Sequence, residues 1–234
     1  GTDTVKATVG GNPAKNTVTV TYVIGNTITI SSNTKWSDIH LPTYNGTGPG
    51  GQPSAADKII INSGSTVTVD VSSAVANTVT LGGGGSSTGN LTFNSGSILN
   101  VYTLAKNTTS GTCNVNMSGG GILIITGSIT GTGFTWTTTK GSINYSGAGS
   151  QSMTNGPATY YDLATTGTVT ATLGKNTTVS HNLTISDGTT FNAAGYNLTV
   201  SGTTRVGDGT SGTLTISYTT GTKIFVGLVT INNG

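Results

Sequence analysis

The sequence is poor in charge and in long apolar runs, and each shortage argues against a class of protein. Only 7% of the 234 residues are charged, and every acidic residue is an aspartate. The formal net charge of +2 is too small to indicate a nucleic-acid partner, because such binding depends on clustered basic side chains. No apolar run reaches the roughly 18 residues of a membrane-spanning helix, so we expect no membrane span.

The chain contains a single cysteine, Cys113, which excludes an intrachain disulfide. The fold must therefore be held by packing and by backbone hydrogen bonds. We expect Cys113 to be a buried strand thiol, and a bridge to another chain is the alternative. The chain begins with Gly1 and shows no signal peptide, and we interpret it as a processed mature segment.

Small hydroxyl residues and β-branched residues dominate what is present. Thr and Ser together make up about a third of the chain, Gly occurs 37 times, and Leu, Ile, Val and Phe make up about a fifth. Val and Ile outnumber Leu about threefold, and branching at Cβ favours strands over helices. Strong helix formers are scarce, since Glu is absent and Met occurs twice. The sequence therefore predicts an ordered all-β protein rather than a disordered linker.

Short segments alternate between apolar and polar residues along the whole chain. This period of two predicts strands with one buried face. Asn-Gly, Asp-Gly and Ser-Gly pairs between the segments favour tight turns. The clearest segments are residues 17–21, 27–30, 66–70, 182–185, 197–200 and 213–216.

The later strands recur at a nearly regular spacing. Their central apolar residues are Val169, Leu183, Leu198, Leu214 and Val229. A drifting spacing of roughly 15 residues is typical of stacked rungs, and we predict a parallel β-solenoid. Successive hairpins of an antiparallel β-sandwich are the alternative.

A Gly- and Pro-rich stretch at residues 45–53 is the best candidate for a boundary. We assign residues 1–50 to an N-terminal β segment and residues 51–234 to a repetitive β-solenoid domain. The N-terminal segment is expected either to cap the stack or to serve as an assembly arm that pairs with another copy.

Two regions carry a resemblance to a known family. Residues 36–38, Pro53, residues 57–64 and residues 67–70 resemble the entry region of G8-like β-helical domains in large secreted prokaryotic surface proteins. Residues 160–167, 182–188 and 195–202 are similar to repeats of such proteins. The resemblance implies a parallel β-solenoid and an extracellular, cell-surface location, and it carries over no catalytic residue.

Candidates for chemistry are few, and we expect no enzyme. Asp57 and Asp70 flank one predicted strand pair and are the candidates for a metal site, with calcium as the ion. No further cofactor is expected. His40 and His181 stand alone, whereas a zinc site needs three or four ligands.

The aromatic residues suggest a different activity. Trp36, Trp136, Tyr160 and Tyr161 are candidates for stacking on sugar rings, although strand aromatics commonly fill a core. Our main hypothesis is a non-catalytic structural component of an extracellular surface assembly, such as a filament, sheath, surface layer or adhesin stalk. Its partners would be copies of itself, joined through β-edges, and surface glycans. The alternatives are a carbohydrate-binding module and an ice-binding adhesin domain with stacked Thr-x-Thr pairs.

Overall fold

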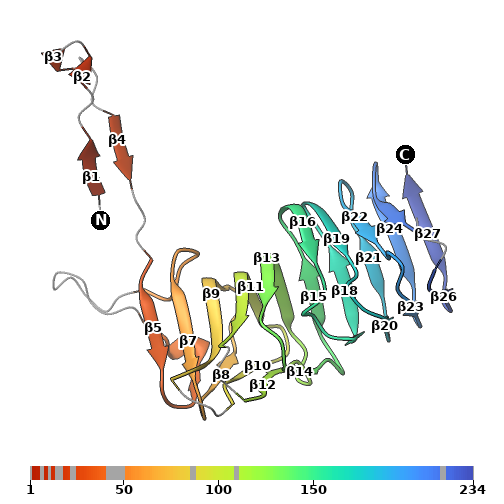
Figure 1. Ribbon diagram of the computed structural model, residues 1–234, viewed down its shortest axis with the longest axis horizontal. Helices are drawn as coiled ribbons and strands as arrows, with labels where there is room; N and C mark the ends of the chain where they lie inside the picture. Colours follow the sequence, from red (N-terminus) through yellow and green to blue (C-terminus); the bar gives the residue numbers. More distant parts are fainter. Residues whose placement is uncertain are drawn as a thin grey trace.

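The chain is a parallel β-solenoid of about 8 turns, as predicted, and not an antiparallel sandwich. The computed structural model describes residues 2–5, 8–9, 12–13, 18–21, 25–40, 51–84, 88–107, 111–216 and 220–233. Successive turns lie side by side along one axis, with β27 at the C-terminal end (Figure 1). No helix in these residues is long and apolar enough to cross a membrane.

Each complete turn follows three sides of the solenoid. In the N-terminal half of the solenoid, sides one and two belong to one continuous sheet, because three long strands run along side one and then continue onto side two. The pairing of the second of these strands shifts in register after Val101, where the strand turns the corner. These long strands are β9 (Ala74–Gly83), β11 (Ile98–Lys106) and β13 (Ile122–Thr130). Side one continues with β15 (Ser142–Tyr145), β18 (Asp162–Thr165), β21 (Leu183–Ile185), β24 (Thr204–Gly209) and β27 (Val229–Asn233).

The other two sides are built in the same parallel manner. Side two comprises β5 (Thr27–Ile30), β7 (Lys58–Asn62), the second halves of the long strands, and then β16 (Ala148–Ser152), β19 (Thr168–Thr172), β22 (Thr190–Asn192) and β25 (Thr213–Thr215). Side three comprises β6 (Thr34–Lys35), β8 (Thr66–Val69), β10 (Asn90–Phe93), β12 (Cys113–Asn116) and β14 (Phe134–Thr137). A separate sheet follows on that side, with β17 (Thr159–Tyr160), β20 (Thr177–Val179), β23 (Leu198–Val200) and β26 (Lys223–Phe225).

The predicted N-terminal segment, residues 1–50, contributes both to the stack and to a separate part. β1 (Thr2–Val5) pairs antiparallel with β4 (Val18–Thr21), and β2 (Thr8–Val9) pairs with β3 (Asn12–Pro13). β5 already pairs in parallel with β7, so the stacked sheet includes a strand from before residue 51. A short 3₁₀ helix, η1 (Trp36–Asp38), follows β6. Most of the Gly- and Pro-rich stretch at 45–53 lies outside the described residues.

The repeat of the structure is longer than the spacing that the sequence suggests. Leu163 pairs with Leu183 on the next rung, and Thr204 pairs with Val229. The number of residues from one member of a pair to the other is the length of one turn. Consecutive members of the predicted series lie on different sides, since Leu183 is in β21 on side one and Leu198 is in β23 on side three. The prediction that one turn spans roughly 15 residues was therefore wrong. That spacing separates strands on different sides of the solenoid, not equivalent strands of successive turns.

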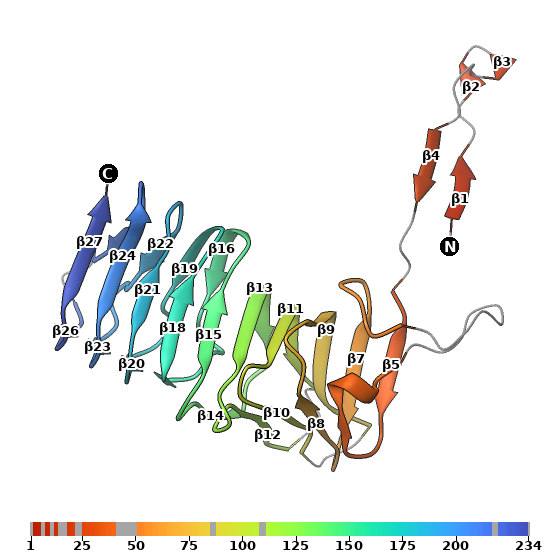
Figure 2. The ribbon, with the colours of Figure 1, turned by 180° about the vertical axis from the view of Figure 1, so that it is seen from behind.

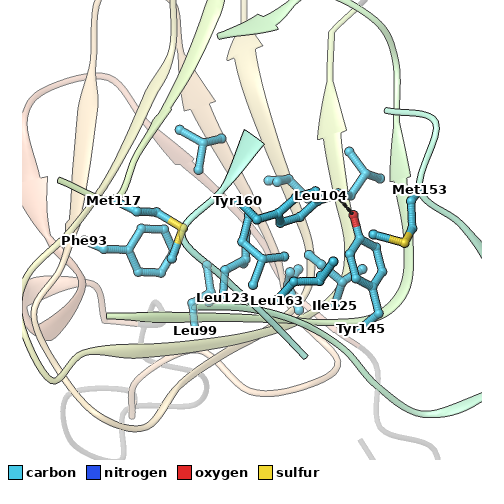
Figure 3. Close-up of a cluster of buried hydrophobic side chains, with 14 of the residues drawn as sticks. Phe93, Leu99, Leu104, Met117, Leu123, Ile125, Tyr145, Met153, Tyr160 and Leu163 are labelled. Carbon is cyan, nitrogen blue, oxygen red and sulfur yellow. Dashed lines mark hydrogen bonds between the residues drawn. The ribbon is translucent and has the colours of Figure 1, made fainter. Parts of the chain in front are cut away.

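The core is a set of columns that run along the axis. On side one, a column of inward apolar side chains passes from rung to rung, and all its members are buried; they are Ala74, Leu99, Leu123, Ile143, Leu163 and Leu183. Figure 3 shows such side chains filling the interior. Burying each Val, Leu or Ile contributes about 2 kcal/mol. Cys113 is also buried in β12, as predicted.

Candidate functional site

Asp57 anchors two loops rather than standing free. It is buried, and its carboxylate accepts hydrogen bonds from the backbone N–H and side-chain amide of Asn26, at 2.6 and 3.1 Å. It also accepts from the backbone N–H and hydroxyl of Ser54, at 2.7 and 2.6 Å. Burial alone would raise the pKa of Asp57, but these hydrogen bonds outweigh burial and hold the pKa below its ordinary value.

Asp70 has a comparable role at a different loop. Its two oxygens accept the backbone N–H of Ser37 at 3.0 Å and the Ser37 hydroxyl at 2.7 Å. Desolvation opposes ionisation here too, and the hydrogen bonds from Ser37 lower the pKa of Asp70 in spite of it. Asp57 and Asp70 thus serve separate loops. Within the described residues, no three His, Cys, Asp or Glu side chains gather where they could hold a metal ion.

Two of the predicted glycan-stacking residues lie in the core, which corrects the prediction for them. Trp36 is fully buried at the N-terminal end, and its Nε1 has no hydrogen-bond partner among the described residues. Tyr160 is also buried, and its hydroxyl lies 3.1 Å from that of Tyr145 (Figure 3). Burial raises the pKa of both tyrosines. Neither ring can offer a face to a sugar, because both side chains are buried.

Tyr161 is half-buried, and another ring covers one of its faces. Its ring stacks on His181 with centroids 4.7 Å apart and planes inclined at 22°. His181 in turn contacts Asp162, with Nδ1 and Oδ1 at 2.8 Å. This cluster joins side chains from adjacent rungs, and its geometry is that of a stabilising contact.

Trp136 differs from the other three candidates because it borders a hollow. Side three is interrupted between β14 and β17, which belong to separate sheets. At this interruption Phe134 and Trp136 are half-buried, with ring centroids 5.6 Å apart. They line a hollow of about 370 Å³ together with Thr132, Gly133, Thr154, Asn155, Gly156, Ala158 and Lys175. The sequence singled out Trp136, but only the stacking of strands reveals the hollow.

Small polar side chains, all but one of them hydroxyls, form two columns on side two. The pairing of β16, β19, β22 and β25 brings alternate residues into register, while the residues between them, such as Ala171 and Phe191, are buried. One column is Ser150, Thr170, Thr190 and Thr213, and the other is Ser152, Thr172, Asn192 and Thr215. The ice-binding alternative requires such columns in one register, and it stays a prediction.

The two ends of the stack differ in how the core is covered. At the N-terminal end, Trp36 and Ile39 are buried against the first rungs. At the C-terminal end, the last rung leaves large apolar side chains exposed, and among the described residues no strand pairs with the outer edge of β27 (Figure 2). Leu228 and Val226 are each 70% exposed and Ile231 is 64% exposed. Ile216, Ile224 and Val229 are exposed at the same end. We call this surface the open end.

These features define the protein as a parallel β-solenoid that has an apolar open end and a hollow lined by two aromatic rings. Comparison with family models, with curated proteins and with solved structures finds no match to the chain. The resemblance to G8-like domains therefore stays a prediction. The sequence did not single out the open end; its signal was the apolar run from Ile224 to Ile231, which has the composition of a core.

Proposed function

We propose that this chain is a non-catalytic structural component of an extracellular surface assembly, and that copies associate through the open end. The observation that carries the proposal is the group of exposed apolar side chains on the last rung, beside the free edge of β27. A free strand edge pairs readily with another strand, and an apolar patch next to it adds a hydrophobic driving force.

The partner that fits this surface is a second copy of the chain. Ile231 stacks on Val206 and Val229 stacks on Thr204, so both occupy inward positions of the core columns. Another β-rung placed on them would continue those columns and remove the apolar groups from water. Because β5 also has a free edge within the part of the chain that the structure describes, the open end can meet either its own counterpart or the first rung of another copy.

The carboxylates support a structural rather than a catalytic role. Asp57, Asp70 and Asp187 accept hydrogen bonds from backbone N–H groups, and Asp57 and Asp70 also accept from hydroxyls. A general acid or base must instead be able to exchange protons with a substrate near neutral pH. The lowered pKa values of these three groups point away from that behaviour.

The proposal is tested by sedimentation of the chain over a range of concentrations. We expect the natural chain to associate as concentration rises, and the double variant Leu228→Lys with Ile231→Lys to do so at least about tenfold more weakly, because two apolar contacts are replaced by charges that resist burial. Dimers would indicate that two open ends meet, and longer assemblies that the open end meets β5.

The matched control is Tyr102→Lys, which changes an exposed apolar side chain in the middle of the stack. It should associate as the natural chain does, and high salt should not disrupt either, since the contact is apolar. A natural chain that stays monomeric at every concentration contradicts the proposal, as does equal weakening by Tyr102→Lys.

A further inference from the structure

The hollow beside Trp136 is a consequence of an interrupted β-ladder. β12 pairs with β14 along four residues, and β14 is the last strand of its sheet. The next turn reaches side three through residues 153–158 and forms only the short strand β17, which pairs with β20. Pro157 lies in that connection and has no N–H to donate to a ladder.

The interruption uncovers side chains that would otherwise be in the core. Phe134 pairs with Cys113 and Trp136 pairs with Val115, and both of these partners are fully buried. Phe134 and Trp136 thus occupy inward positions, yet they stay half-buried because the following turn does not cover them. Their rings meet at 44°, so the hollow has an apolar wall made of two inclined aromatic rings.

Other residues that line the hollow supply polar groups. The ammonium of Lys175 donates to the Gly156 carbonyl at 2.9 Å, and an ammonium has further N–H groups to donate. The side-chain amide of Asn155 donates to the Ile129 carbonyl at 2.9 Å, which holds this side chain in place in the lining of the hollow. The Thr154 hydroxyl lies 2.8 Å from that of Ser152. No carboxylate is among the described residues that line the hollow.

We infer that this hollow binds one pyranose unit of a polysaccharide. A pyranose ring has an apolar C–H face that suits an aromatic wall, and hydroxyls at its edge that suit ammonium, amide and hydroxyl groups. A volume of about 370 Å³ lies at the lower end of the roughly 300–1,000 Å³ of ligand pockets, which are mostly apolar with a few polar groups. Trp136 provides the stacking face, and Lys175 and Asn155 hold the hydroxyls.

The first test uses tryptophan fluorescence with a panel of soluble oligosaccharides, some neutral and some bearing carboxylate or sulfate groups. The chain has two tryptophans, and Trp36 is fully buried, so a ligand-induced change reports on Trp136. We expect a saturable change with at least one sugar class. An alternating Thr–Val peptide in the same series tests strand addition to the edge of β14. Saturation by the peptide and by no sugar overturns the inference, as does the absence of any binding.

The second test measures the affinity of variants by calorimetry. Trp136→Ala should weaken binding roughly tenfold or more, in line with the loss of one stacked ring, whereas Trp136→Phe should retain much of it. Lys175→Gln should weaken binding and reduce any preference for anionic sugars. Tyr161→Ala is the control, because it removes an aromatic ring elsewhere on the surface, and it should leave the affinity unchanged.

Two outcomes of the second test contradict the inference. One is equal binding by Trp136→Ala and the natural chain, and the other is loss of binding in Tyr161→Ala. Circular dichroism of each variant verifies the fold, and the retention of binding by Trp136→Phe separates ring stacking from a general loss of structure. The result is independent of the open end, whose variants lie on the last rung.

Discussion

At the scale of single residues, Asp57 accepts four hydrogen bonds from Asn26 and Ser54. These bonds join the start of the first rung to the connection that precedes β7. A buried carboxylate that is fully hydrogen-bonded stabilises its surroundings mainly because its removal leaves donors without partners.

The corresponding prediction compares two aspartates. Asp57→Ala should lower the free energy of unfolding by about 3 kcal/mol, since several donors lose a charged acceptor. Asp208→Ala is the control, because its ion pair with Arg205 is solvent-exposed and such pairs contribute about 0–1 kcal/mol. Urea denaturation of both variants measures the difference. Equal losses would contradict the anchoring role of Asp57.

Asp187 provides a pH-dependent contact. Its carboxylate accepts the backbone N–H groups of Ser211 at 3.0 Å, Asp208 at 2.7 Å and Thr210 at 3.2 Å. These bonds, from Ser211 first, lower the pKa of Asp187 from 3.8 to about 2. Because the folded pKa is depressed, the stabilisation is present above the unfolded value and is lost as the pH falls through the folded one.

We therefore expect the turn at residues 208–211 to loosen as the pH falls from about 4 to about 2. Amide resonances of Asp208 and Ser211, followed by NMR, should titrate with a midpoint near the lower of these values. Asp187→Asn should abolish that titration while the rest of the spectrum is preserved. A midpoint near 4 would show that the hydrogen bonds do not stabilise the charged form.

At the scale of elements, the close approach of adjacent rungs constrains the corners. Gly167 has a φ of +80°, and a Cβ there would lie 2.6 Å from the carbonyl oxygen of Gly147 on the preceding rung. Gly149 has nearly the same φ, +81°, but a Cβ there meets nothing within 4 Å. A substitution at Gly149 therefore measures the cost of backbone strain alone, whereas one at Gly167 adds the cost of a clash between rungs.

Gly149→Ala should cost about 1 kcal/mol, which is the penalty of a left-handed conformation for a residue with a Cβ. Gly167→Ala should cost about 2 kcal/mol more, since two rungs must move apart to accommodate the methyl group. Thermal or urea denaturation of the two variants measures the difference. Equal costs would mean that the corner yields without disturbing the stack.

The strands themselves could be predicted from the sequence, because alternation is a local property. Residues 27–30, 66–69 and 213–215 are strands as expected. The length of a turn could not be predicted, because it depends on which strand lies above which. Similar alternating segments follow one another along the chain at a nearly regular spacing, but successive segments lie on different sides of the solenoid. The spacing therefore does not give the length of a turn.

At the scale of the whole molecule, a solenoid has two ends that its regular interior lacks. Each rung is covered by its neighbours, so stability accumulates along the axis and the terminal rungs are the least covered. Here the N-terminal end has Trp36 and Ile39 buried against it, whereas the C-terminal end leaves Leu228 and Ile231 in water. The association predicted for the open end belongs to this scale, because it arises from the position of the last rung in the stack.

The same dependence on neighbouring rungs explains why some of the predicted glycan-stacking residues are buried and one borders a hollow. Trp36, Trp136 and Tyr160 all lie in or beside alternating segments, and composition alone does not separate them. Trp36 and Tyr160 are covered by neighbouring rungs, while Trp136 lies where the ladder of side three stops. The exposure of each side chain depends on whether the next turn of the chain covers it, and a local sequence pattern does not contain that information.

The amino-acid sequence by itself determined the all-β character of this protein, the inward direction of the apolar residues in its alternating segments, and the burial of Cys113. These follow from Cβ branching and from the period of two, which act over a few positions. Only the tertiary structure decided the three-sided turn, the hollow beside Trp136 and the open end. Those features depend on contacts between successive rungs, such as the pairing of Leu163 with Leu183 and of Thr204 with Val229. Local patterns contain no information about where a ladder is interrupted or which rung is left uncovered.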